Sequence, residues 1–396
     1  MENTSRLYDT LMTTMVKLVK WVDIRHLHTL SWMITGLILS EKISLTAWIP
    51  YVQGRAEMAQ STQRRFSRWL HNKKIMVNDL YGPIIQSALT EWGENRLYLA
   101  LDTSMLWNRF CLIQISIIYR GRAIPFVWKV IEHNSSSVGF ADYKELLETA
   151  QQRLPLHFRG EVLFLADRGF ADTQLMDFLT HDLQWHWRIR IKSSFLVYRP
   201  KHRRCQVGHI KPKVGEAHFL HHVRLTAERF GPVHLALAHL RENDEQWLIA
   251  SDQPTSVETF DEYGLRFDIE EGFLDEKSNG FQLESSLFRD AEALSRLCFV
   301  LAVATLYLVS VGTDFTQNDN RRRVDPHWFR GNSFFRIGWL FVKHALSKVW
   351  ALLSRFALSP LPDPEPSVSS RSQFLALPSI RLKVTFFRYA QPAFPV

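Results

Sequence analysis

The order of hydrophobic patterns in residues 96–192 limits the possible folds more than any other feature of the sequence. Three stretches have the composition of β-strands, RLYLALDTS and the two halves of RFCLIQISIIYRGRAIPFVWKVIE, which a turn at Gly121 divides. A helical stretch, ADYKELLETAQQRL, comes next, followed by the strand EVLFLAD, a helix from about Ala171 to Leu179, and the strand WHWRIRI. Hairpin-linked strands that continue into alternating helices and strands predict an α/β domain.

Two aspartates, Asp102 and Asp167, each come directly after an apolar strand of this domain. Ligands of α/β sheets bind at the ends of strands, so the two carboxylates would converge if their strands are neighbours. The order of the elements is that of an RNase H-like core. We expect this core in two parts, residues 96–192 and residues 253–313.

The remaining regions differ in composition from this core. Residues 193–252 contain short strand-like stretches rich in Lys, Arg and His, which predict an inserted β subdomain, and residues 1–95 have helical patterns. A basic, helical C-terminal region, 314–396, includes the Pro/Ser-rich linker SPLPDPEPSVSSRS. The apolar run 297–312 is shorter than the roughly 20 residues that span a bilayer, so we expect a buried core helix.

Charge and cysteine content restrict the class of partner and the compartment. The chain has 48 Lys and Arg against 40 Asp and Glu, a formal charge of +8. This excess favours a polyanionic partner, nucleic acid first and an anionic membrane second. Cys111, Cys205 and Cys298 show no CxxC spacing, so neither a disulfide framework nor a zinc knuckle is indicated. The N-terminal MENTSRLYDT lacks the apolar segment of a secretory signal, and we expect a cytoplasmic protein.

The stretch STQRRFSRWLHNKK predicts a basic amphipathic helix. One side of this helix is apolar and is expected to face inward, with Phe66, Trp69 and Leu70. The other side is expected to face outward and carries Arg64, Arg65 and Arg68. Two interpretations stay open: a helix presented to DNA, and an ordinary basic surface helix.

The segment YGLRFDIEEGFLDEK, residues 263–277, concentrates acidic side chains among apolar ones. On a helix that advances about 100° per residue, one narrow stripe holds Tyr263, Arg266, Glu270 and Lys277, while Glu271 points elsewhere. Apolar residues flank the stripe on both sides. The segment is therefore either a solvated surface helix with i,i+4 charge pairs or a helix that holds Glu270 at the edge of the core.

Three carboxylates, Asp102, Asp167 and Glu270, form a set of hard oxygen ligands. Such ligands suit Mg²⁺, with Mn²⁺ as a substitute, and do not suit zinc. Two ions about 3.5–4 Å apart can activate an attacking oxygen and stabilise the leaving oxygen of a phosphodiester. We therefore expect two-metal chemistry on DNA.

The spacing Y-(2)-R-(3)-E-(6)-K of the stripe, together with LALDTS and FLADRGF upstream, resembles that of the DDE transposases of the bacterial insertion-sequence-four family. The resemblance extends from about residue 96 to 312. It implies an RNase H-like catalytic domain that performs Mg²⁺-dependent cut-and-paste transposition with Asp102, Asp167 and Glu270. It also implies that phosphates near the cleaved end are held by Tyr263, Arg266 and Lys277.

Further assignments depend on weaker matches. EQWLIASDQP resembles the strand of this family whose tryptophan stacks on a flipped base, which would be Trp247; the alternative is a tryptophan of the core. Arg168 either contacts a phosphate or pairs with a nearby acid. The basic helix suggests that the N-terminal region binds the terminal inverted repeats, and analogy with the family suggests a homodimer in the synaptic complex.

The sequence thus predicts a bacterial, nucleoid-associated DNA transposase that excises an insertion sequence from double-stranded DNA and joins it to target DNA. One alternative is a nuclease of the same fold without strand transfer. Another is a transposase-derived DNA-binding protein that is no longer catalytic. A protein of the membrane surface is a third alternative, which we do not expect.

Overall fold

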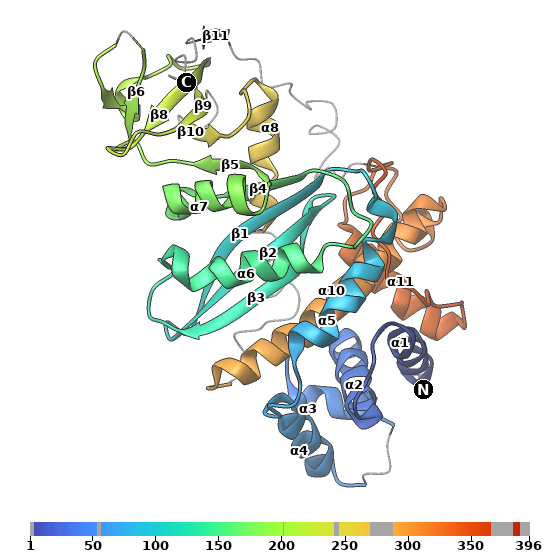
Figure 1. Ribbon diagram of the computed structural model, residues 1–396. Coiled ribbons are helices and arrows are strands. Elements are labelled where there is room, and N and C mark those ends of the chain that lie inside the picture. The colour runs from blue at the N-terminus through green and yellow to red at the C-terminus, as the bar shows by residue number, and fades with distance from the viewer. Residues whose placement is uncertain are drawn as a thin grey trace.

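One large mixed β-sheet, shown in Figure 1, organises the molecule. The computed structural model describes residues 4–53, 57–200, 202–240, 245–269, 288–365 and 383–388. Within these ranges the strands follow the order β3-β2-β1-β4-β5-β10-β9-β8-β6-β7, and β11 pairs with β8 beside this path. The strands are β1 (Leu97–Leu106), β2 (Phe110–Tyr119), β3 (Arg122–Glu132), β4 (Val162–Ala166), β5 (His186–Arg190), β6 (Leu196–Tyr198), β7 (Cys205–Gln206), β8 (Glu216–Leu225), β9 (Phe230–His239), β10 (Gln246–Ser251) and β11 (Lys383–Arg388).

The first five strands confirm the α/β pattern expected from the sequence. β2 pairs antiparallel with β1 and with β3, whereas β4 pairs parallel with β1 and with β5. α6 (Phe140–Arg153) packs against β2 and β3, and α7 (Thr173–Asp177) continues as a π-helical turn over Phe178–Asp182 before β5. Every residue of β2 is buried, which is typical of a strand covered on both faces of its sheet.

The β insertion extends this sheet. β10 pairs antiparallel with β5 through Ile249–Arg190, Ala250–Ile189 and Ser251–Arg188, and β9 and β8 follow outward. The last five residues of β10 are buried, as in the central strand of a sheet. A second hydrophobic cluster forms here from Ala217, Phe219, Ala236, Ala238, Trp247, Ile249, Phe260 and Tyr263.

Helices from both ends of the sequence gather beside the sheet (Figure 1). They are α1 (Thr4–Leu18), α2 (Ile24–Ser40), α3 (Leu45–Trp48), α4 (Ala59–Leu70), α5 (Val77–Ala88), α10 (Ala291–Gln317) and α11 (Phe334–Lys348). The Trp339 indole nitrogen on α11 donates a hydrogen bond of 2.7 Å to the Ile38 carbonyl on α2. The Trp69 ring on α4 stacks on Phe299 of α10 with 6.3 Å between centroids. The N- and C-terminal regions therefore share one core.

α10 contains the apolar run that predicted a core helix. Its length and hydropathy alone would allow it to cross a membrane, but 94% of its most apolar 18-residue window is buried inside the molecule. The core-helix prediction is confirmed. α10 crosses α11 at Gly312 and Gly338, where a Cβ on either glycine would lie 1.9 Å from a carbonyl oxygen of the opposite helix. Two residues without side chains let the two backbones touch here.

α4 confirms the expected orientation of the basic helix in most respects. Phe66, Trp69 and Leu70 are buried, and Arg64 and Arg68 are exposed. Arg65 differs, because its guanidinium carbon lies 5.4 Å from the centre of the Phe66 ring and its side chain is partly buried. Burial lowers the pKa of Arg65, with Tyr8 acting in the opposite direction.

Candidate active site

Asp102 and Asp167 lie side by side at the centre of the sheet. In the parallel pairing of β1 with β4, Leu101 is the register partner of Ala166, and each aspartate is the next residue of its chain segment. Neighbouring strands are about 4.8 Å apart, so the two Cα atoms are separated by roughly that distance and both side chains leave the same face. The strands of the two aspartates are neighbours, as the predicted convergence requires.

β5 adds a third side chain to this row. Ala166 on β4 is the register partner of Ile189 on β5, which places Arg190 beside Asp167 in the same way. Asp167 directly follows β4 and Arg190 ends β5, but Asp102 lies inside β1, one residue beyond its last pairing with β4, so the expectation that Asp102 comes directly after its strand is wrong. The sequence alone did not single out Arg190. Its signal was the same as that of the aspartates, a polar residue directly after a buried strand position.

The Asp102 carboxylate is held from both sides. Its Oδ1 accepts a hydrogen bond of 2.7 Å from the Thr103 backbone N–H, and its Oδ2 lies 3.5 Å from Nη1 of Arg266. The side chains of Asp102 and Arg266 are 20% and 5% exposed. The Asp167 carboxylate is half-buried and makes no hydrogen bond or ion pair with any described residue. Asp167 therefore has its oxygens available for a ligand.

The helix expected to carry Tyr263, Arg266, Glu270 and Lys277 is not continuous. α8 (Glu258–Gly264) ends at Gly264, a residue type with low helix propensity. The next backbone bonds span three residues instead of four, with Arg266 N–H to the Tyr263 carbonyl at 3.0 Å and Ile269 N–H to the Arg266 carbonyl at 3.1 Å. A stripe drawn at a uniform 100° per residue is therefore wrong across this junction.

Two members of the proposed signature, Glu270 and Lys277, lie outside the described residues, as does Glu271. The described range before these residues ends at Ile269, whose side chain is fully buried. Arg266 contacts Asp102, as shown above, so the segment that precedes Glu270 does reach the aspartates.

Tyr263 on α8 is fully buried and belongs to the second hydrophobic cluster. Burial raises the pKa of Tyr263 to about 12, while Arg266 lowers it, Asp167 raises it and Arg190 lowers it. Burial of the phenol is the largest of these causes. A direct contact between Tyr263 and DNA phosphates, which the resemblance implied, would require the phenol to become accessible.

Trp247 lies on β10 with the environment of a core residue. Its side chain is 8% exposed, and its ring contacts Tyr263 at 5.5 Å and Phe267 at 5.8 Å between centroids. The indole nitrogen is buried and has no hydrogen-bond partner among the described residues. The surroundings match the alternative reading of the sequence, a packing tryptophan, and stacking on a flipped base stays a prediction.

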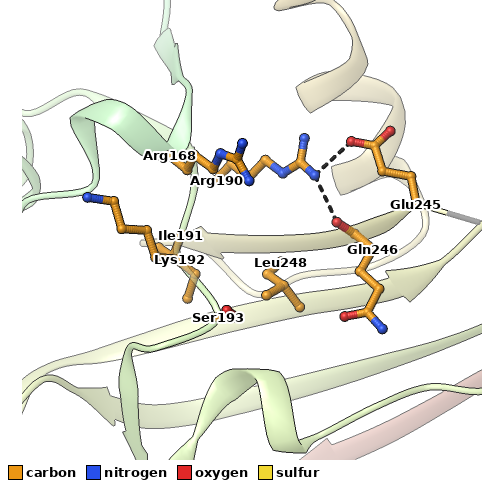
Figure 2. Close-up of a pocket in the computed structure, with 8 residues that line it drawn as sticks. All are labelled: Arg168, Arg190, Ile191, Lys192, Ser193, Glu245, Gln246 and Leu248. Atoms are coloured by element: carbon orange, nitrogen blue, oxygen red, sulfur yellow. Dashed lines mark hydrogen bonds and ion pairs between the residues drawn. The ribbon is translucent and has the colours of Figure 1, made fainter. Parts of the chain in front are cut away.

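A pocket of about 590 Å³ is lined by Arg168, the residue that follows Asp167, and by residues in and near β5 and β10 (Figure 2). We call it the strand-end pocket; its polar lining consists of Arg168, Arg190, Lys192, Ser193, Glu245 and Gln246. Arg190 pairs with Oε1 of Glu245 at 2.7 Å and donates a hydrogen bond of 2.9 Å to the Gln246 carbonyl. Arg168 is exposed, and its side chain pairs with no described acid. Of the two roles expected for it, an ion pair with a nearby acid is therefore not seen, and a phosphate contact stays a prediction.

Glu262 on α8 fixes the position of the segment that carries Tyr263 and Arg266. Its Oε2 accepts a hydrogen bond of 2.9 Å from Nε of Arg188 on β5, and its Oε1 accepts one of 2.8 Å from Nη1 of Arg96. Arg188 is 5% exposed. Ion pairs with little solvent access hold their geometry, so Glu262 joins α8 to the sheet. No local pattern around Glu262 predicts this role.

The donor chemistry of the row suits a hard divalent cation. Asp102 and Asp167 offer carboxylate oxygens from neighbouring strands, as Mg²⁺ requires. Among the residues that the structure describes, no group of three or more His, Cys, Asp and Glu side chains could hold a metal ion. The third carboxylate of the expected set, Glu270, belongs to the part of the chain that is not described.

These features define an α/β protein with two acidic side chains side by side on neighbouring parallel strands, where the pairing of those strands ends. Residues 108–307, just over half of the 396 residues, match the sequence model of the family described as Transposase DDE domain. The chain belongs to this family and is a DDE transposase. The matched range includes Asp167, Arg190, Arg266 and Glu270, and it begins after Asp102.

Among solved structures, the chain is similar to that of the piggyBac transposase in a synaptic complex with hairpin DNA, determined by cryo-EM. The two sequences are 9% identical, the alignment covers 94% of this chain and 89% of the other, and the TM-score is 0.41. No curated protein matches the chain.

Proposed function

We propose that this transposase performs Mg²⁺-dependent cut-and-paste transposition of an insertion sequence and belongs to the insertion-sequence-four family. The observation that carries the proposal is the position of Asp102 and Asp167 side by side, each one residue beyond the last pairing of β1 with β4, with Arg266 in contact with Asp102. The strand order β3-β2-β1-β4-β5, with one antiparallel pair of hairpins and two parallel neighbours, supports an RNase H-like catalytic core.

In this proposal Asp102, Asp167 and Glu270 hold two Mg²⁺ ions, with Mn²⁺ as a substitute. When bound, such ions lower the pKa of an attacking water and stabilise the leaving oxygen of the phosphodiester. Water first nicks the end of the element, the freed 3′-OH then attacks the opposite strand, and the excised end is finally joined to target DNA. The carboxylates act by positioning, because the sheet fixes two of them in adjacent strands.

Arg266 has the geometry of a group that can change partner. Its 3.5 Å separation from Asp102 is longer than the 2.7–2.9 Å of a strong charge-assisted hydrogen bond. Its guanidinium also lies 4.5 Å from the centre of the Phe267 ring, which supports the planar group from one side. We propose that Arg266, with Lys277, holds the phosphates near the cleaved end, and that Tyr263 joins them where its phenol becomes accessible.

We propose that the helical N-terminal region recognises the DNA of the element ends. We also propose that two copies of the chain form a homodimer in the synaptic complex. Replacing Arg64 and Arg68, the two exposed arginines of α4, should reduce the salt dependence of binding to element ends. Since each phosphate contact contributes roughly 0.9 to the slope of log K against log salt, the expected reduction is about 2. An unchanged slope would make α4 an ordinary surface helix.

The experiment that tests the proposed function uses the inverted repeats in the DNA that flanks the gene. Purified protein is incubated with a duplex carrying these repeats and a target plasmid, and the strands are resolved on a denaturing gel. Mg²⁺ should give nicks at the element ends, then double-strand cleavage, then joined products, and EDTA should remove all three. Cleavage without joined products would indicate a nuclease, and binding without cleavage a non-catalytic derivative.

A further inference from the structure

The strand-end pocket carries more positive charge than its own acid neutralises. Arg168, Arg190 and Lys192 line it, against one carboxylate, Glu245, which is already paired with Arg190 at 2.7 Å. Arg168 and Lys192 are exposed, and their side chains make no hydrogen bond or ion pair with any described residue. Figure 2 shows the bonds of Arg190 to Glu245 and Gln246, with the Lys192 ammonium extended away from both. Two cations are therefore left for a ligand.

The pocket is fixed to the aspartate row by the backbone. Arg168 follows Asp167 directly and opens the short 3₁₀ turn Arg168–Phe170, and Arg190 lies beside Asp167 through the register of β4 with β5. Asp102 lies on the opposite side of Asp167, toward β1. A ligand in the pocket would therefore sit next to Asp167 on the β5 side.

We propose that the strand-end pocket binds a phosphate group of the DNA backbone, with Arg168 and Lys192 in direct contact and Arg190 adding charge from the sheet. Guanidinium and ammonium groups recognise phosphate oxygens through charge-assisted hydrogen bonds. This inference rests on the proposed function, because the DNA strand cleaved at the aspartates continues past them. A backbone phosphate to one side of the cleaved bond would thus be held at the β5 edge of the site.

DNA is a better occupant than a free anion. Sites for small anions surround the ligand with fixed donors such as successive backbone N–H groups. Here the two available cations stand on long, exposed side chains, as in protein surfaces that neutralise the phosphates of nucleic acid. The pocket volume of about 590 Å³ also exceeds the space that one phosphate ion occupies.

Glu245 competes with the ligand for Arg190. Its side chain is 34% exposed, and its carboxylate lies at the same pocket wall as the guanidinium. A phosphate that enters must therefore approach one negative charge as well as three positive ones. Removal of this charge should strengthen DNA binding, whereas removal of Arg168 and Lys192 should weaken it.

The test measures binding of a labelled duplex made from the flanking inverted repeats, by anisotropy, over a series of KCl concentrations without divalent ions. The double variant Arg168→Ala, Lys192→Ala should lose about 2 from the slope of log K against log salt, roughly 0.9 for each phosphate contact. Arg159→Ala is the matched control, because this exposed arginine precedes β4 at the opposite end of the strand. Its slope should equal that of the wild type.

Glu245→Gln provides a test of opposite sign, with an expected gain in affinity of about two- to fivefold, the range of an exposed charge pair. Inorganic phosphate alone should change the melting temperature of wild type and double variant equally. An unchanged salt slope in the double variant would overturn the inference, whether or not inorganic phosphate binds. If the wild type binds and cuts the duplex while this occurs, only the phosphate pocket is wrong; if the wild type neither binds nor cuts, the proposed function itself fails.

Discussion

Nη1 of Arg266 lies 3.5 Å from Oδ2 of Asp102, although 164 residues separate them in the sequence. This contact brings the segment after α8 to the place where the pairing of β1 with β4 ends, next to Asp167. It also gives the buried guanidinium, which is 5% exposed, a negative partner. The contact joins one of the two proposed metal-binding aspartates to the residue proposed to hold the DNA phosphates.

Arg266→Ala should reduce DNA cleavage by roughly 10²–10³-fold, the usual loss when one preorganised electrostatic group is removed from a reaction site. Arg266→Lys should restore part of the rate, because it keeps the charge but not the planar fork. Single-turnover cleavage of the flanking-repeat duplex measures both variants. A rate within a factor of two of the wild type for Arg266→Ala would contradict the phosphate-holding role.

Trp247→Ala should destabilise the fold by about 3–5 kcal/mol, as expected when a packed tryptophan is truncated. The reason is its contact with Phe260, Tyr263 and Phe267 at 8% exposure. A thermal melt beside a strand-resolved cleavage gel separates the two readings of this residue. A normal melt, with loss of only the step that needs a distorted duplex, would instead support stacking on a flipped base.

Much of the site could be predicted because strand ends are marked by local sequence. Asp102 and Asp167 stand out since each follows a run of apolar residues, and their strands proved to be neighbours. Arg190 belongs to the same row, but its position depends on the pairing of β4 with β5, which no local pattern encodes. The expected helix is interrupted after Gly264, because backbone hydrogen bonds between Glu262 and Ile269 span three residues instead of four; the positions of Glu270 and Lys277 lie outside the described residues.

In the helical regions too, features set by neighbouring residues in the sequence could be predicted, whereas contacts between distant residues could not. The apolar run of α10 predicted burial correctly, since a helix that is apolar on all sides needs neighbours on all sides. That its neighbours come from both ends of the chain was not predictable. The bond from Trp339 to the Ile38 carbonyl spans 301 residues and leaves no periodic signal.

Stability should fall in mildly acidic solution because of His234. Burial, then the charges of His221, His222 and Arg188, lower the pKa of His234 from 6.5 to about 4. Between these two values the unfolded chain binds a proton that the folded chain does not. The contribution of neutral His234 to the free energy of unfolding is therefore complete above pH 6.5. It is lost as the pH falls toward 4, by about 3 kcal/mol in all.

Melting temperatures from pH 7 to 4 test this expectation. His234→Gln should show a flatter pH dependence than the wild type, while His181→Gln, at a side chain that is 71% exposed, should follow the wild type. Parallel curves for wild type and His234→Gln would mean that His234 titrates normally in the folded protein.

Gly312→Ala should destabilise the crossing of α10 and α11 by about 1–3 kcal/mol or more, as overpacking of a core does. The added Cβ would lie 1.9 Å from the Phe334 carbonyl oxygen, so the helices must move apart. Gly264→Ala is the control, because its Cβ would meet only the Trp247 ring at 4.0 Å. Denaturant unfolding should show a large shift for the first variant and little loss for the second.

The measurement that tests the central claim most directly is Mg²⁺-dependent cleavage by the single variants Asp102→Asn and Asp167→Asn. Asp177→Asn, on the exposed surface of α7, is the control. The account predicts that the first two variants bind the flanking-repeat duplex as tightly as the wild type but cut neither strand, while the control cuts normally. Cleavage at the wild-type rate by either Asp102→Asn or Asp167→Asn would contradict it.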